Sequence, residues 1–336
     1  MVKRTKALTV NIVPSDSTNE TFDVALAALL RCLPLLTNLT ALDINYASLH
    51  VATLFRTITS CSLARRLQQL SLMGHTEVFA FIQKYCTHKT PFENLTKLSL
   101  ELHRAFDNDT QMESLNLEFF LRSLAPTLQS LQIINRSFQL DLSPLFSAFS
   151  QHDSPVFFPN LKSLSLHHSS FLTPCQSLCH FLRNNNHLQH LHLNMTPPFS
   201  YRKSDPWCEW LIELVNDASF PSLQSLDIYP SNNQAGRSAV LTLIKRTALT
   251  LSSLKLFGHC MPRHIADQMV NALTELEVHQ LKSLSLNVTG LSVSFLDLLA
   301  RNLPQLEGLF LWTLQVVGRG KVCFFPPLLS LNLVQM

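Results

Sequence analysis

A leucine hexad repeated along the chain constrains the fold of this protein more than any other sequence feature. The hexad has the form LxxLxL, with isoleucine allowed at the last position, and a degenerate first copy, TKALTV, begins at Thr5. From Leu39 to Leu328 there are 289 residues in ten steps, so the mean spacing is 28.9 residues. A fixed period of this length indicates an architecture of stacked structural repeats. The hexads begin at Leu39, Leu67, Leu95, Leu128, Leu161, Leu188, Leu223, Leu251, Leu281, Leu306 and Leu328.

The residues after a hexad have the periodicity of an amphipathic helix, and prolines such as Pro126 and Pro221 stand two residues before the next hexad. Proline disfavours helix in the residue before it, so it separates helix from strand. The repeat is therefore a strand, a loop, a helix and a loop, and neighbouring repeats must cover each other's leucines. We predict one α/β domain over residues 1–336: a right-handed solenoid of about 11–12 repeats, with a curved parallel sheet inside and helices outside. Length alone would suggest about two domains.

The hexads and their period resemble leucine-rich repeats of the ribonuclease-inhibitor-like class. The phrases FPNLKSLSL and FPSLQSLDI are similar to the repeat region of F-box/leucine-rich-repeat proteins. The F-box itself is not seen ahead of the repeats. The asparagine ladder of the family is also absent, because positions such as Ala47, His75 and Ser169 occupy its place. The resemblance implies a non-enzymatic scaffold that recognises proteins, like the substrate-recognition region of an F-box-type ubiquitin ligase component.

Composition and motifs exclude several other classes of function. Only 15% of the residues are charged and the net charge is +3, which excludes a nucleic-acid binder driven by a basic surface. The chain has 7 glycines and lacks both common glycine-rich phosphate-binding motifs, so we predict no cofactor. No apolar run is long enough to span a membrane, and no signal peptide is recognisable. The eight cysteines form no CxxC pair, which favours free thiols and an intracellular location, cytoplasmic or nuclear.

The side chains between the hexad leucines should face solvent on the inner side of the sheet, because residues alternate between the two faces of a strand. About a dozen strands would make a face roughly 50 Å long, which suits another protein or an extended peptide. Aromatic anchors beside small residues are typical of protein-binding hot spots. A long loop after one strand adds polar and aromatic residues at the rim. The predicted partner-binding residues are His167, His190, His192, Tyr229, Phe257, Phe310, Trp312, Tyr201 and Arg202.

Other readings of the same face remain open but are not favoured. Ser165, His192 and Asp227 share the fifth hexad position on consecutive strands, which permits a hydrolase with a Ser-His-Asp row. No nucleophile elbow or oxyanion hole accompanies this row, so we predict no catalytic residues. His187, His190 and His192 invite a zinc hypothesis, but His187 precedes the strand and zinc needs three or four convergent ligands, so we predict no metal site. A third alternative is the ligand-sensing repeat region of a larger receptor.

The ends of the repeat array lack the polar caps that solenoids require. Leu8 already lies within the pattern, and the last hexad, LLSLNL, is followed by only three residues. We therefore expect the outermost strands to present unpaired edges. A missing neighbouring domain or end-to-end self-association would resolve this.

Overall fold

The computed structural model describes the chain except for short segments. Described are residues 5–11, 19–45, 51–60, 62–75, 91–103, 110–136, 142–151, 158–168, 176–195, 206–230, 233–275, 280–318, 321–324 and 330–334. The chain divides into two compact units, Met1–Leu172 (unit 1) and Thr173–Met336 (unit 2), and each is described by itself. The predicted extent of a single solenoid over residues 1–336 stays a prediction.

Unit 1 contains a parallel sheet in which the strands follow one another in sequence order. Each strand pairs with the next in register, from Ala7↔Ala41 at one edge to Ser130↔Ser163 at the other. Its strands are β1 (Ala7–Asn11), β2 (Ala41–Asn45), β3 (Gln69–His75), β4 (Lys97–His103), β5 (Ser130–Asn135) and β6 (Ser163–His168). Its helices are α1 (Asn19–Cys32), the 3₁₀ turn η2 (Leu33–Leu35), α2 (Val51–Ser60), α3 (Leu63–Arg66), α5 (Thr110–Leu124) and α6 (Ser143–Gln151).

Unit 2 repeats the arrangement and then changes it at its last strands. β7 to β11 form a parallel sheet in sequence order, and β12 and β13 both pair with β11 in the antiparallel direction. The strands are β7 (His190–Met195), β8 (Ser225–Ile228), β9 (Ser253–Met261), β10 (Ser283–Ser292), β11 (Gly308–Gly318), β12 (Lys321–Phe324) and β13 (Ser330–Val334). The helices are α7 (Gln176–Asn184), α8 (Pro206–Asp217), α9 (Gln234–Thr247), α10 (Arg263–Glu275) and α11 (Val293–Asn302).

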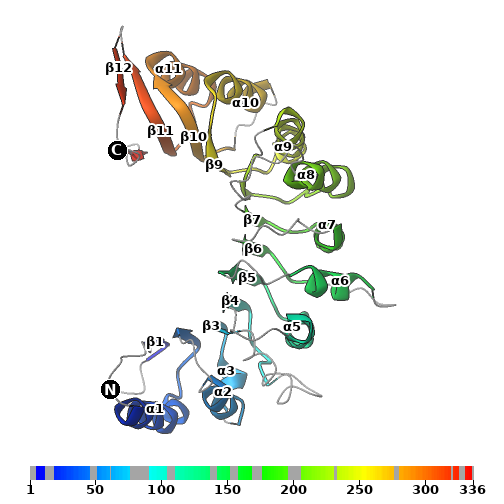
Figure 1. Cartoon of the computed structure of the whole chain (residues 1–336), viewed down its shortest axis with the longest axis vertical. Coiled ribbons are helices and arrows are strands. Elements are labelled where there is room, and N and C mark those ends of the chain that lie inside the picture. The colour runs from blue at the N-terminus through cyan, green and yellow to red at the C-terminus, as the bar shows by residue number, and fades with distance from the viewer. Residues whose placement is uncertain are drawn as a thin grey trace. The chain divides into compact units, whose positions relative to one another are not determined.

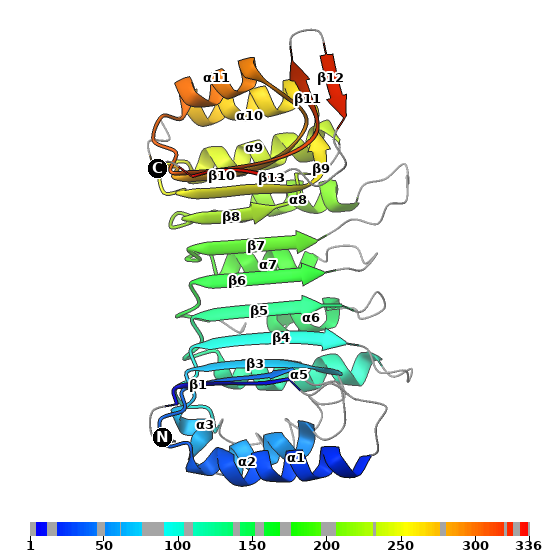
Figure 2. The same ribbon diagram turned by 90° about the vertical axis from the view of Figure 1, so that its left-hand side faces the viewer.

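The helices of each unit lie on one face of its sheet, as Figure 1 shows. Figure 2 looks onto the other face, over which no helix passes in the described residues. The leucines of the hexads that begin at Leu39 to Leu281 point to the helical side and are buried; Leu42 is 2% exposed and Leu98 is 2% exposed, for example. Phenylalanines fill the space below the sheet in unit 1, where the rings of Phe55, Phe92 and Phe120 lie 5.5–6.2 Å apart. The predicted α/β class, with parallel strands and covering helices, is therefore confirmed, whereas the handedness and the repeat family stay predictions.

The same backbone contact fixes the register from one repeat to the next. The carbonyl of the residue before a strand accepts hydrogen bonds from two consecutive amides of the following repeat. Thr40 accepts them from Gln68 and Gln69, and Gln68 accepts them from Thr96 and Lys97, at 2.8–3.1 Å. In unit 2 the carbonyl of Ser252 accepts hydrogen bonds from the amides of Lys282 and Ser283 in the same way. Equivalent hexad positions therefore lie side by side on neighbouring strands.

The last hexad corrects the prediction that all eleven hexads form parallel strands. β13, which contains the end of this hexad, runs antiparallel to β11 with Phe310 opposite Asn332 and Trp312 opposite Ser330. The reason is chain length. β11 continues to Gly318, and only 11 residues separate Gly318 from Ser330, four of which form β12. A parallel return needs a crossover of about a dozen residues or more, whereas an antiparallel return needs only a turn. The edge of β11 is thus hydrogen-bonded to β12 and β13.

Candidate functional site

Three charged or titratable side chains form a row on the helix-free face of unit 2. His192 on β7, Asp227 on β8 and Lys255 on β9 are direct register neighbours. The Nζ atom of Lys255 donates to Oδ2 of Asp227 at 2.9 Å, and Nδ1 of His192 lies 3.5 Å from the same oxygen. The side chain of Asp227 is 11% exposed, against 35% for His192 and 51% for Lys255. We call these three residues the charged row.

The charged row offers hydrogen-bond donors rather than acceptors to a ligand. Oδ1 of Asp227 is buried without a hydrogen-bond partner, and Oδ2 is already engaged. An ammonium group carries three N–H donors, so Lys255 keeps donors for a partner after it binds Asp227. Beside the row lies His190, whose pKa is lowered by burial and further by the charge of His192. His190 is therefore predominantly neutral near pH 7.

The residues of the hydrolase alternative are divided between the two units, and the metal alternative can be compared with the described residues. His192 and Asp227 lie together in unit 2, while Ser165 lies on β6 of unit 1, where its hydroxyl is 3.0 Å from Nε2 of His167. No group of three or more histidine, cysteine, aspartate or glutamate side chains among the described residues could hold a metal ion. Four cysteines among the described residues are free thiols. Cys179 and Cys208 are buried, Cys260 is partly buried and Cys32 is exposed.

A second feature of the same face is an apolar shelf on β11. Phe310 is 39% exposed, Trp312 is 45% exposed and Leu314 is 50% exposed, while the alternate residues Leu311 and Thr313 are buried. We call Phe310, Trp312 and Leu314 the aromatic shelf. On β10 the register neighbours of its two rings are the small polar residues Ser285 and Asn287. Large apolar side chains thus stand above small neighbours.

Phe257 and Tyr229, which we predicted to lie exposed near this shelf, behave differently from each other. Phe257 is partly exposed, and Nζ of Lys255 lies 5.5 Å from the centre of its ring. The expectation that Tyr229 is exposed is wrong, because its side chain is 2% exposed. β8 ends at Ile228, so Tyr229 is no longer held to the alternation of the strand. Its ring packs 6.5 Å from that of Trp207, whose Nε1 donates to the Tyr229 carbonyl at 2.8 Å.

The structure describes some, but not all, of the remaining residues that we predicted to bind a partner. His167 lies on β6 in unit 1, and His190 and His192 lie on β7 in unit 2. Tyr201 and Arg202 of the rim loop fall outside the described residues. Sequence reasoning missed Lys255 and Leu314 as site residues. Lys255 stands at the same hexad position as Asp227 one repeat later, and this shared position could have predicted their contact. Leu314 lies beyond its hexad, on a strand whose length the hexad does not predict.

Comparison with known proteins places the chain in no family: no family model matches it, and no curated protein is significantly similar to it. Within the described residues, no helix has the length and apolar character needed to cross a membrane.

Proposed function

We propose that this protein is a non-enzymatic scaffold that binds an extended segment of another protein on the helix-free face of unit 2. The observation that carries the proposal is the aromatic shelf, where Phe310 and Trp312 stand 39% and 45% exposed on one strand. Exposed aromatic residues next to small ones are the usual anchors of protein interfaces. The charged row lies on neighbouring strands of the same face and supplies the polar contacts that fix the orientation of a bound chain.

The geometry of the face supports a partner that binds in extended form. Phe310 is the register neighbour of Ser285, and Ser285 is the register neighbour of Lys255. Strands lie about 4.8 Å apart, so β9, which carries Lys255, and β11, which carries the shelf, are separated by roughly 10 Å across the sheet. A chain in extended conformation spans that distance in about three residues. The donors of Lys255 favour an acidic residue in the partner at that separation from an apolar one.

The repeats are similar to the substrate-recognition region of F-box/leucine-rich-repeat proteins, and the proposed class of scaffold is therefore an intracellular component of that kind, of right-handed leucine-rich-repeat form. Under this proposal the bound segment belongs to a protein destined for ubiquitin ligation. Co-purification of an adaptor of cullin ligases with the full-length gene product supports this assignment, and its consistent absence refutes it without affecting the binding function itself.

The binding function is tested by photo-crosslinking from the shelf. p-Benzoylphenylalanine at position 312 should crosslink a protein from cell extract, and Phe310→Ser should abolish that crosslink. Phe119 on α5 is a matched control, because it is also a large apolar side chain, 52% exposed, but lies in unit 1. Equal crosslinking in Phe310→Ser and Phe119→Ser would show that the shelf does not select a partner. A generic esterase screen with Ser165→Ala as control tests the proposed absence of hydrolase activity.

A further inference from the structure

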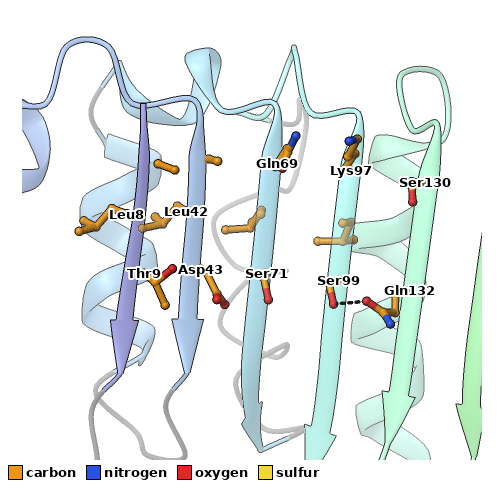
Figure 3. Close-up of a pocket in the computed structure, with 14 residues that line it drawn as sticks. Leu8, Thr9, Leu42, Asp43, Gln69, Ser71, Lys97, Ser99, Ser130 and Gln132 are labelled. Carbon is orange, nitrogen blue, oxygen red and sulfur yellow. Dashed lines mark hydrogen bonds between the residues drawn. The ribbon is translucent and has the colours of Figure 1, made fainter. Parts of the chain in front are cut away.

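Unit 1 carries a hollow on the helix-free face of β1 to β5, with a volume of about 410 Å³. Figure 3 shows how its walls are built from rows of side chains that cross the strands. One row consists of the register neighbours Thr9, Asp43, Ser71, Ser99 and Gln132. The Ser99 hydroxyl donates to Oε1 of Gln132 at 3.0 Å, so the polar groups at this end of the row are already paired with each other. The other end contains the carboxylate of Asp43.

Asp43 is the unsatisfied group of the hollow. Its Oδ1 atom is buried and has no hydrogen-bond partner, and no ion pair of the described residues includes this carboxylate. Its neighbours in the row are two hydroxyl residues, Thr9 on β1 and Ser71 on β3. The lysine of the hollow, Lys97, stands on β4, two strands away and in a different row. A carboxylate held against a sheet is stabilised by a donor from a cation, and the hollow leaves space for one.

The protein itself shows which group an aspartate at this position binds. Asp43 and Asp227 occupy the same place in two similar hexads, LTALDI and LQSLDI. In both, Oδ1 is buried without a partner. Asp227 receives the ammonium group of Lys255 from the next strand at 2.9 Å on Oδ2. In unit 1 the residue at the place of Lys255 is Ser71, whose side chain ends in a neutral hydroxyl and supplies no cation.

We propose that the hollow of unit 1 binds the ammonium group of a lysine side chain from an extended partner segment, which takes the place that Lys255 has in unit 2. An ammonium group has three N–H donors, and the carboxylate of Asp43 with the hydroxyls of Thr9 and Ser71 provides three acceptors on adjacent strands. A compact point charge suits acceptors on three separate strands better than the planar fork of a guanidinium, which prefers two parallel oxygens. That the lysine belongs to a partner protein rests on the proposed function.

The test uses a capped peptide as probe, acetyl-Gly-Ser-Lys-Ser-Gly-amide, titrated into the full chain labelled with ¹⁵N and followed by NMR. The lysine ammonium is its single charge. We expect saturable shifts at β1 to β3, and about tenfold or greater weakening in the isosteric variant Asp43→Asn. Ser71→Lys should abolish binding, because it recreates the Asp227–Lys255 pair inside unit 1. Asp297→Asn, which removes an exposed carboxylate on α11 of unit 2, is the matched control and should leave the titration of unit 1 unchanged.

Three results would overturn the proposal. One is the absence of a saturable shift at peptide concentrations of about 10 mM. Another is equal binding of the peptide in which glutamine replaces lysine. The third is unchanged affinity in Asp43→Asn. Ser71→Ala, which removes one acceptor without adding charge, provides a variant that folds even where Ser71→Lys does not, and it should weaken binding a few-fold. Because the probe needs no natural partner, these results are independent of the crosslinking experiment on the aromatic shelf.

Discussion

Gly258→Ala should destabilise unit 2 strongly, although it adds a single methyl group. Gly258 has φ of 102°, a backbone conformation that side chains with a Cβ rarely adopt. It lies in a bulge of β9, where the register with β10 shifts between Leu286 and Val288. A Cβ at this position would lie 2.1 Å from Cδ2 and 2.2 Å from Cε2 of Tyr229. The ring of Tyr229 is 2% exposed, so it cannot move aside into solvent.

Two independent costs add to give the magnitude. Holding a residue with a Cβ at this φ costs about 1–2 kcal/mol. Overlap of the added carbon with the buried ring of Tyr229 costs about 1–3 kcal/mol, as overpacking does. We therefore expect the free energy of unfolding to fall by about 2–5 kcal/mol. For a unit of this size the melting temperature should fall by about 4–20 °C, since each kcal/mol corresponds to roughly 2–4 °C.

Tryptophan fluorescence in urea is the appropriate assay, because all 3 tryptophans of the chain, Trp207, Trp210 and Trp312, lie in unit 2. Gly308→Ala is the matched control. Its Cβ would meet Cε2 of Phe310 and Oγ of Ser283 at 3.7 Å, an ordinary contact, so stability should change by less than about 1 kcal/mol.

A double-mutant cycle separates the two costs of Gly258→Ala. In a Tyr229→Ala background the steric cost disappears and only the backbone cost should remain, so the two substitutions should couple by about 1–3 kcal/mol. A loss below about 1 kcal/mol for Gly258→Ala alone, or the absence of coupling, would refute the argument.

Three further predictions concern titratable groups. Lys255→Met should lower the free energy of unfolding by about 1–2 kcal/mol in the same urea assay, because it leaves the buried Asp227 without its ammonium partner; an unchanged midpoint would contradict this. The lowered pKa of His190 means that the unfolded chain binds a proton more readily, so stability should be full above about pH 6.5 and fall below it. His190→Asn should flatten that part of the pH profile, and a slope that persists unchanged would assign it to other groups. Burial raises the pKa of the Cys260 thiol, so peptide mass spectrometry should find it alkylated by iodoacetamide more slowly than the exposed Cys32; the reverse order would be inconsistent with the structure.

The hexads predict the strands well because they encode a local property. Alternation of leucine with polar residues determines which side chains face the helices, and this held for the leucines of the hexads that begin at Leu39 to Leu281. It also places equivalent positions side by side, so the proximity of His192 and Asp227 follows from the sequence. The exposure of Phe310 and Trp312 was predicted for the same reason and is confirmed.

The features that the sequence did not predict depend on where a strand ends. The hexad does not show that β8 ends at Ile228, which allows Tyr229 to turn inward, or that β11 extends to Gly318. The antiparallel direction of β13 follows from that extension, because too few residues remain for a crossover. Strand length depends on contacts between repeats, such as the bulge at Gly258 against Tyr229. Such contacts cannot be predicted from the sequence of one repeat alone.

The shared carbonyl contacts that set the register also have an evolutionary consequence. In unit 1 the step between register-equivalent residues is 28 residues from Gln68 to Thr96 and 33 residues from Ser99 to Gln132, yet the alignment of the strands is unchanged. An insertion between strands is therefore absorbed before the next strand begins, and does not displace the residues that line the exposed face. Mutation can lengthen or shorten the connecting segments while selection acts separately on single positions such as Asp43 or Lys255. A lineage of such proteins can diverge in length and overall sequence and still retain, or exchange, its binding specificity one strand at a time.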